Sequence, residues 1–285
     1  MPSTVGAMLA GGIAGLRSSD SARTDALLLL AHALGRSRAW ILAHDDALVT
    51  EADGRRFSAL CAARGEGRPI AYVLGEAGFY GRAFAVDERV LVPRPETERL
   101  IDEAVTFLRD AGRAAPSVLD VGCGSGAIAC TLAAEVSDAA VLGSDDSAGA
   151  LAVAAENARR LGVAARCTFA CGDLAAPAGG RRFDVVVANL PYVPTASVGL
   201  PPQAVGFEPR HALDGGPDGL DVYRRFVPAA PALMKPAGLL LLEAAPPQMD
   251  ELSALARAAF GAERVAEGSD FAGLARYVRI ETPAP

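Results

Sequence analysis

The chain has 285 residues, of which 51% are hydrophobic and 21% are charged, so it can form one large or two unequal globular domains. Its net charge of −7 argues against broad, sequence-independent binding to nucleic acid, because such binding needs clustered Lys and Arg that neutralise phosphates. The five cysteines form no CxxC pair and the three histidines offer no zinc-ligand spacing, so we expect no metal site and a reducing, cytoplasmic location.

Residues 1–75 are predicted to form a helical domain. The opening segment is mildly apolar, without a basic start or a cleavage site, so we expect a first helix and not a signal peptide. Asp25–Leu34 is a leucine and alanine run that stops at Gly35, and Glu51–Arg64 has helical spacing with glycines after it. The apolar stretch Ala26–Leu34 is too short to span a membrane, so we expect no membrane association.

A β-hairpin linker is predicted over residues 76–96. Between Tyr72 and Val92, glycines and aromatic residues give way to the alternating run AVDERVLVP (85–93), a pattern typical of paired strands. The prolines of PRPETERLIDEAVTFL (93–108) precede an acidic first turn, which predicts the start of an amphipathic helix.

Residues 97–285 are predicted to form an α/β domain. Short apolar runs alternate with helical segments after Pro116, which indicates a mostly parallel sheet covered on both faces. The predicted strands are Ser117–Val121, Ala139–Ser144, Arg166–Ala170, Phe183–Ala188 and Gly238–Glu243, with a further pair at Arg264–Glu267 and Ala275–Ile280. The predicted helices between the earlier strands include Gly126–Val136 and Ala148–Leu161.

The sequence DVGCGSG (120–126) follows a predicted strand and opens a helix. Its glycines permit a tight turn and let backbone N–H groups approach an anionic ligand at the start of the helix. Asp145 stands at the end of the second strand, where a carboxylate can accept hydrogen bonds from both ribose hydroxyls of a nucleoside cofactor; neighbouring Asp146 fits the strand end less well. Any tight turn favours glycine, but the loop and the acid together indicate a nucleoside cofactor.

The DxGxGxG form resembles the first motif of class I S-adenosylmethionine methyltransferases. This resemblance implies S-adenosylmethionine as the cofactor and Asp145 as its ribose ligand. It also implies cofactor contacts from Gly122, Cys123, Gly124, Ser125 and Gly126.

Asn189–Tyr192 (NLPY) follows the predicted strand FDVVVA directly. A strand that ends in a proline turn gives the same letters, so the tetrapeptide alone leaves both interpretations open. An amide nitrogen is a poor nucleophile because its lone pair is delocalised, and a site can help by accepting hydrogen bonds from both of its N–H groups. The Asn189 side-chain oxygen and the Leu190 carbonyl are candidate acceptors, and Tyr192 offers a flat face to a planar target. Holding the nitrogen roughly 3–3.5 Å from a methyl carbon can supply on the order of 7–11 kcal/mol without an ionisable base.

NLPY resembles the [D/N]PPY motif of amino- and amide-nitrogen methyltransferases. Leu190 replaces the first proline, and we expect this departure to be tolerated, because leucine also has a carbonyl and Pro191 already favours an extended conformation before it. The same tetrapeptide resembles the form found in adenine-N6 dimethylases of ribosomal RNA, which makes adenine a rival substrate.

The segment RPIAYVLGEAGFYGRAFAVDERVLVPRPETE (Arg68–Glu98) resembles the HemK/PrmC family of release factor glutamine methyltransferases. The resemblance continues through DVGCGSGAIA, FDVVVANLPY, Phe207–Arg225 and GLLLLE (Gly238–Glu243), and it covers nearly the whole chain. It implies a Rossmann-like domain with a seven-stranded, mostly parallel sheet and an N-terminal helical domain that docks the protein substrate. The implied reaction is N5-methylation of the glutamine in the GGQ motif of peptide chain release factors.

Family roles carried onto this chain place Asn189, Leu190, Pro191 and Tyr192 on the glutamine amide, with Asn189 also near the cofactor. The family often has an aromatic residue beside the adenine after the third strand. Leu174 follows Asp173 at that place here, so the resemblance implies apolar contact without stacking.

Three alternatives stay open from the sequence. A ribosomal-protein glutamine methyltransferase shares the fold and the motif. An adenine-N6 methyltransferase fits NLPY, although the charge and the PRPETE segment disfavour it, so no stable nucleic-acid binding is expected. A cofactor-binding relative without activity would fit Leu190, but the retention of Asn189 and Tyr192 disfavours it.

Overall fold

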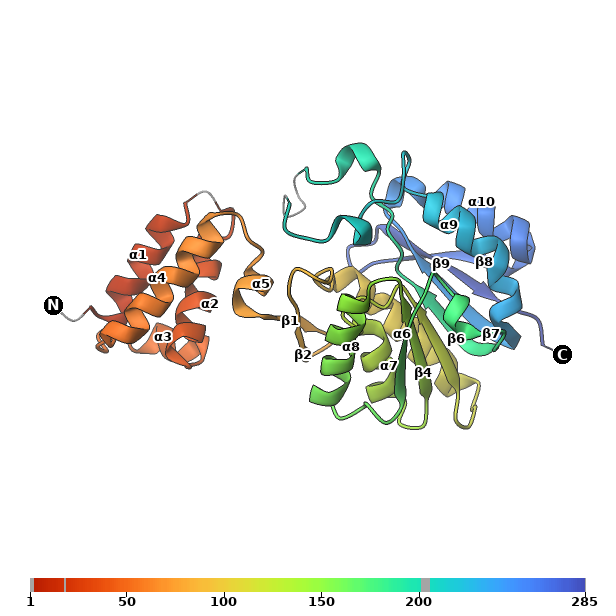
Figure 1. The fold of residues 1–285 in the computed structure, drawn as a ribbon, viewed down its shortest axis with the longest axis horizontal. Coiled ribbons are helices and arrows are strands. Elements are labelled where there is room, and N and C mark those ends of the chain that lie inside the picture. Colours follow the sequence, from red (N-terminus) through yellow and green to blue (C-terminus); the bar gives the residue numbers. More distant parts are fainter. Residues whose placement is uncertain (1–2, 18, 201–205, 285) are drawn as a thin grey trace. The chain divides into compact units, whose positions relative to one another are not determined.

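A computed structural model describes residues 3–17, 19–200 and 206–284. The chain divides into two units, Met1–Glu76 and Ala77–Pro285 (Figure 1). Each unit has a hydrophobic core of its own, so each is described by itself below.

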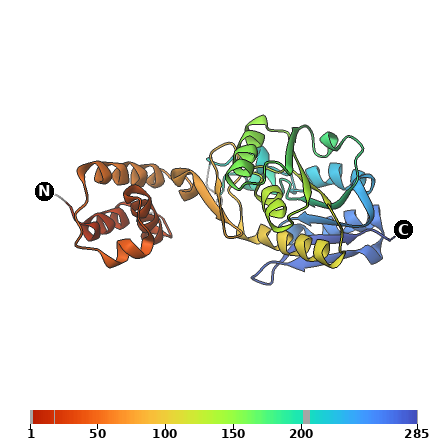
Figure 2. The same cartoon turned by 90° about the horizontal axis from the view of Figure 1, so that it is seen from below.

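The first unit is a bundle of helices, seen from a second side in Figure 2. Three of its helices, α1, α3 and α4, begin at polar caps: the side chains of Thr4, Ser37 and Thr50 each accept a backbone N–H of the first turn, as expected for residues that satisfy the free donors of a helix start. The helices are α1 (Val5–Gly15), α2 (Ala22–Leu34), α3 (Arg38–Ala43), α4 (Glu51–Gly65) and α5 (Ile70–Leu74). The predicted end of α2 at Gly35 is confirmed, because Gly35 caps it in the left-handed conformation.

A two-stranded hairpin, β1 (Glu76–Phe79) and β2 (Arg82–Ala85), confirms the predicted hairpin but is shorter. The prediction that the run 85–93 continues as a strand is wrong, because no strand follows Ala85 there. The buried Asn157 side chain accepts the Ala85 N–H at 2.7 Å and donates to the Ala85 carbonyl at 3.0 Å. These bonds occupy the backbone N–H and carbonyl of Ala85, so the hairpin ends at this residue.

The second unit contains a seven-stranded sheet, which confirms the predicted α/β fold. The strands lie in the order β5-β4-β3-β6-β7-β9-β8, and β9 is antiparallel to both of its neighbours while the other pairs are parallel. The strands are β3 (Ser117–Val121), β4 (Ala140–Asp145), β5 (Cys167–Cys171), β6 (Phe183–Ala188), β7 (Met234–Glu243), β8 (Val265–Ser269) and β9 (Ala275–Glu281).

Helices cover both faces of this sheet (Figure 1). One face packs against α6 (Glu98–Asp110), α7 (Ala127–Glu135) and α8 (Ala148–Arg160). The other face packs against α9 (Asp221–Phe226) and α10 (Met249–Phe260). Because both faces are covered, a central strand must be apolar on both sides, and every residue of β6 is buried.

Within the described ranges, no helix combines the length and the apolar character that crossing a membrane requires.

Candidate functional site

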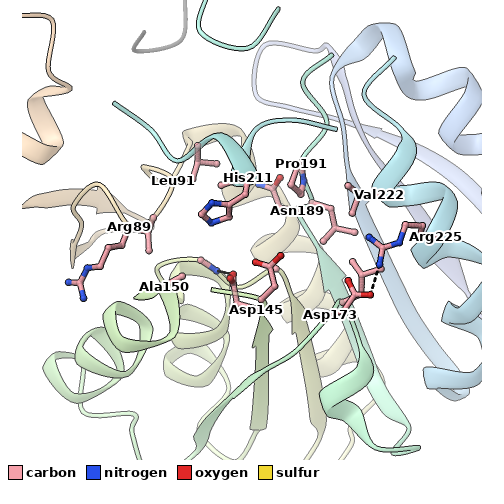
Figure 3. A pocket seen from close by; sticks show the side chains of 17 residues that line it. Arg89, Leu91, Asp145, Ala150, Asp173, Asn189, Pro191, His211, Val222 and Arg225 are labelled. Carbon is pink, nitrogen blue, oxygen red and sulfur yellow. Dashed lines mark hydrogen bonds and ion pairs between the residues drawn. The ribbon is translucent and has the colours of Figure 1, made fainter. Parts of the chain in front are cut away.

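A cavity opens where β3, β4 and β6 end (Figure 3). Gly122 and Gly124 line it after β3, Asp145 lines it at the end of β4, and Asn189 lines it after β6. The carboxyl ends of parallel strands form one edge of a sheet, which is where ligands bind in open α/β folds. The structure therefore brings the two predicted motifs to a single cavity.

The glycine loop after β3 adopts the tight turn that the sequence predicts. Gly122, Gly124 and Gly126 have positive φ angles of 72°, 52° and 75°, which side chains other than glycine rarely adopt. A Cβ atom at Gly124 would meet no protein atom within 4 Å, so a side chain there would extend into open space. The bare backbone at this wall fits a cofactor that approaches it closely.

The N–H groups of the loop are used differently from the prediction. Gly122 and Cys123 both donate to the Ser144 carbonyl, at 2.8 and 2.9 Å, and Gly126 donates to the Cys123 carbonyl at 2.7 Å. These donors therefore shape the loop and are not directed at a ligand. Among the predicted cofactor residues, Cys123, Ser125 and Gly126 do not line the cavity.

Asp145 holds the loop as well as lining the cavity. Its two carboxylate oxygens accept the N–H groups of Gly124 and Ser147, each at 2.9 Å. Burial raises the pKa of Asp145, while these two backbone hydrogen bonds lower it. Each oxygen keeps a further lone pair, so the carboxylate can accept hydroxyl donors from the cavity while it holds the loop.

The Asn189 amide lies at the other end of the cavity. Its Nδ2 donates to the Thr97 hydroxyl at 3.1 Å, and Oδ1 accepts no hydrogen bond from any residue that the structure describes. Leu190 and Pro191 line the same wall. Asn189 thus has an acceptor available to a ligand, which is the arrangement that a substrate amide requires.

Leu190 does more than present a carbonyl. Its N–H donates to the Tyr223 hydroxyl at 3.2 Å, and Tyr223 in turn donates to the carbonyls of Ala188 and Glu243. The leucine side chain is 3% exposed, and a Cβ atom added at Gly122 would lie 3.0 Å from its Cδ2 atom. Proline would remove the hydrogen bond and this packing.

Tyr192 is directed away from the predicted role as a cavity wall. It does not line the cavity; its hydroxyl donates to the Glu243 carboxylate at 3.3 Å, and its ring packs against the core. Burial raises the pKa of Tyr192 above its ordinary range. The Tyr192 carbonyl accepts a hydrogen bond from Gln248 at 2.6 Å, so both ends of this residue are fixed by distant parts of the chain.

Two loops that were not predicted to reach the site form a further wall of the cavity. Arg89 and Leu91 line it from the segment after the hairpin, and His211 lines it from the 3-10 turn Arg210–Ala212. In Figure 3, His211 faces the space above Asp145. Both loops lie in segments that resemble the family, Arg68–Glu98 and Phe207–Arg225, but the resemblance gave these residues no role.

The two loops are tied to each other by a buried carboxylate. Glu208 accepts the N–H of Val92 at 3.2 Å and forms an ion pair with Arg94 at 2.6 Å, and its side chain is fully buried. The Val92 N–H is thus bonded to a side chain, which adds to the Asn157 bonds at Ala85 as a reason why the run 85–93 does not continue as a strand.

The third side of the cavity carries Asp173 and Leu174, the residues expected beside an adenine ring. Asp173 forms an ion pair with Arg225, which also lines the cavity (Figure 3). Leu174 packs against the core as well as lining the cavity. Arg225 was not predicted, because nothing in the sequence places α9 beside the end of β5.

Among the described residues, no group of three or more His, Cys, Asp or Glu side chains is arranged to hold a metal ion.

Comparisons with known proteins agree with this architecture. The family model of the PrmC N-terminal domain matches residues 7–75, and that of a methyltransferase domain matches residues 118–199. A release factor glutamine methyltransferase of Bordetella pertussis is 42% identical over 254 residues, which are 89% of this chain and 93% of that protein. Another, from Cereibacter sphaeroides, is 42% identical over 267 residues, 93% of each chain.

The chain belongs to the release factor glutamine methyltransferase family. This confirms the family resemblance found in the sequence, and it makes the chain an S-adenosylmethionine-dependent methyltransferase.

Solved structures of other methyltransferases share the fold of this chain. A 16S rRNA N2 G1207 methyltransferase of Thermus thermophilus, solved with S-adenosylmethionine and guanosine, matches with a TM-score of 0.53 at 20% identity. The match covers 73% of this chain and 49% of that chain. A methyltransferase of Pyrococcus furiosus matches with a TM-score of 0.50 at 15% identity, over 79% of this chain and 99% of that chain.

Proposed function

We propose that this protein transfers a methyl group from S-adenosylmethionine to the side-chain amide nitrogen (N5) of the glutamine in the GGQ motif of peptide chain release factors. The observation that carries the proposal is the single cavity that Asp145 and Asn189 both line. A residue suited to bind a nucleoside (Asp145) and a residue suited to accept hydrogen bonds from an amide (Asn189) line the same cavity. A methyl transfer between two bound substrates requires such an arrangement. The names of the relatives support a release factor as the acceptor.

The cofactor end is proposed to hold S-adenosylmethionine, which supplies an electrophilic methyl group when bound. Asp145 accepts hydrogen bonds from the ribose, and Gly122 and Gly124 let the cofactor approach their backbone. Leu174 gives the adenine an apolar surface. The fit rests on the bare wall at Gly124 and on the spare lone pairs of Asp145.

The acceptor end is proposed to activate the glutamine amide. Asn189 Oδ1 and the Leu190 carbonyl accept its two N–H groups, which draws electron density onto nitrogen and fixes its orientation. Pro191 keeps Leu190 extended. Tyr192 contributes by anchoring the backbone of the tetrapeptide through its hydroxyl and carbonyl hydrogen bonds.

Labelled S-adenosylmethionine incubated with the protein and a purified release factor tests the proposal. We expect label on one peptide, with fragmentation placing the methyl group on the GGQ glutamine. Release factor with that glutamine changed to alanine is the matched control. Label on a ribosomal protein, or on adenine in RNA at a comparable rate, would refute the release factor as the substrate and support the corresponding alternative.

Substrate choice is proposed to depend on residues 1–75 as a docking domain, with residues 76–96 as a linker and 97–285 as the catalytic domain. One glutamine side chain offers only a few hydrogen bonds, so selectivity needs contacts elsewhere on the substrate. Removing residues 1–70 is expected to leave S-adenosylmethionine affinity unchanged and to raise KM for the intact release factor strongly. A short GGQ peptide should be a poor substrate for both forms. Equal KM values for the truncated and full-length protein would refute the docking role.

A further inference from the structure

The side-chain amide of Asn189 works only in one orientation. An amide has an acceptor oxygen on one side and a donor NH₂ on the other, and half a turn about its last bond exchanges them. With Nδ2 on the Thr97 hydroxyl, Oδ1 is left for the cavity. In the reversed orientation, the NH₂ group would face the NH₂ group of a substrate amide, and neither could accept from the other.

Thr97 selects the orientation through its single proton. It ends the 3-10 turn Pro95–Thr97 directly before α6, it is 4% exposed, and its own N–H donates to the Arg94 carbonyl. A hydroxyl can accept a hydrogen bond from Asn189 Nδ2 and donate its proton elsewhere, or it can donate that proton to Asn189 Oδ1. The second arrangement reverses the amide. The orientation of Asn189 therefore depends on where the Thr97 proton goes.

Glu243, at the end of β7, provides a place for that proton. Its side chain is 1% exposed, and its Oε1 accepts the Tyr192 hydroxyl at 3.3 Å. Burial raises the pKa of Glu243 to about 7, while hydrogen bonding from the Thr97 and Tyr192 hydroxyls lowers it. Its buried Oε2 accepts no hydrogen bond of ordinary geometry in the described part of the chain, so the carboxylate has acceptor capacity to spare. Once it is ionised, above its pKa of about 7, the carboxylate only accepts, so at that pH it draws the Thr97 proton away from Asn189.

We propose that Thr97 and Glu243 are positioning residues that fix the Asn189 amide with its oxygen toward the substrate. The proposal rests on the proposed function, since it assigns the orientation that amide methylation needs. Neither residue lines the cavity, so both act through Asn189. Two strand ends and one helix start thus cooperate: Asn189 follows β6, Glu243 ends β7, and Thr97 stands at the start of α6.

Proton exchange of the Asn189 side chain tests the orientation without any substrate. The Nδ2 resonances in a nitrogen–proton NMR spectrum are assigned by their loss in Asn189→Asp. We expect one Nδ2 proton to exchange about tenfold faster in Thr97→Val than in the wild type, because its acceptor is gone, while Thr97→Ser keeps the protection. Thr97→Ala repeats the measurement should the valine variant fail to fold. Equal exchange in the wild type and in the variants without a hydroxyl would overturn the proposal.

Kinetics test whether the orientation matters to methyl transfer. In Thr97→Val we expect kcat to fall about tenfold, with the KM for release factor, the Kd for S-adenosylmethionine and the Tm nearly unchanged, and Thr97→Ser should restore kcat. A loss confined to Tm or KM would show a structural role and refute the proposal.

Glu243→Gln gives the second arm of the test. The glutamine amide can donate to the Thr97 hydroxyl, which turns the Thr97 proton toward Asn189 and should lower kcat by a similar factor with cofactor affinity unchanged. A fully active Glu243→Gln would remove Glu243 from the proposal. If the wild type methylates no release factor, the proposed function fails, while the NMR exchange still reports whether Thr97 holds the amide.

Discussion

The glycine loop at one end of the cavity is held by its neighbours in one βαβ unit, whereas Asn189–Tyr192 at the other end is held by residues far along the chain. The loop bonds to Ser144 and Asp145, at the end of the next strand. Asn189 depends on Thr97, 92 residues away, and Tyr192 depends on Gln248, 56 residues away. The cofactor end should therefore tolerate changes elsewhere in the fold, while the acceptor end should respond to many of them.

The largest effect is expected at the acceptor end itself. Asn189→Ala removes one acceptor for the substrate amide, and by analogy with the loss of one preorganised oxyanion-hole donor, kcat should fall about 10²–10³-fold. The Kd for S-adenosylmethionine, measured by calorimetry, should stay near the wild-type value, because the cofactor end is built separately. Near-normal turnover in Asn189→Ala would refute the mechanism in which two oxygens accept the N–H groups of the substrate amide.

Leu190→Pro tests the dependence of the acceptor end on Tyr223. Loss of the N–H and of the buried leucine side chain should lower the free energy of unfolding by about 2–4 kcal/mol, followed as the midpoint of urea unfolding. Tyr223→Phe, which removes only the hydroxyl, should cost about 1 kcal/mol. A proline variant as stable as the wild type would restore the view that position 190 serves only through its carbonyl.

The buried carboxyl of Glu243 predicts a pH dependence of stability. Burial raises its pKa to about 7, against lowering by the hydroxyls of Thr97 and Tyr192 and by Arg276, and raising by Glu96. At pH values between the ordinary carboxyl pKa and about 7, Glu243 is protonated in the folded state and ionised in the unfolded state. The free energy of unfolding therefore falls as pH rises through this range, and it levels off above it.

The fall attributable to Glu243 should approach about 3 kcal/mol. It is measured as the difference between the wild type and Glu243→Gln across pH 4 to pH 8, since buried Asp120, whose pKa is also raised to about 7, contributes equally to both. Glu263→Gln on the surface is the control and should follow the wild type. Parallel curves for the wild type and Glu243→Gln would contradict the expected burial of a charge.

Asp145→Ala should weaken S-adenosylmethionine binding by about 1.5–3 kcal/mol, the range for hydrogen bonds to a charged group. Asp146→Ala is the matched control. Asp146 also lines the cavity, but within the described residues its side chain, unlike that of Asp145, accepts no N–H of the glycine loop. Asp145→Asn separates the two roles of the carboxylate, because the amide oxygen can still hold one N–H. Unchanged affinity for S-adenosylmethionine in Asp145→Ala would refute the role of Asp145 in binding the ribose.

Local patterns allowed much of the fold to be predicted from the sequence. The bounds of β3 and β6 match the predicted apolar runs, because a strand buried on both faces is mostly apolar; each of these strands carries a single charged residue, Asp120 in β3 and Asp184 in β6. The alternating run 85–93 misled the prediction, since its alternation reflects two single buried valines, Val86 and Val90, of which Val90 lines the cavity.

The candidate site could be predicted only where the sequence itself carries the geometry. Asp145 and Asn189 follow strands, so strand position alone predicts their meeting. His211 and Arg225 reach the cavity through the paths of loops and of α9, which no local pattern encodes. Thr97 was part of a recognised segment, but its partner Asn189 lies in another, and the hydrogen bond between them appears only once the chain is folded.

The contact between Gly122 and Leu190 has a consequence for how this cavity can change over generations. A side chain at position 122 would press on the Leu190 Cδ2 atom, 3.0 Å from its Cβ, and a larger residue at position 190 would press on the Gly122 backbone. The effect of a substitution on fitness at either position is therefore set by the residue at the other. A smaller residue at position 190 opens space beside position 122, whereas a change at position 122 alone meets both the Leu190 side chain and a φ of 72° that residues other than glycine rarely adopt.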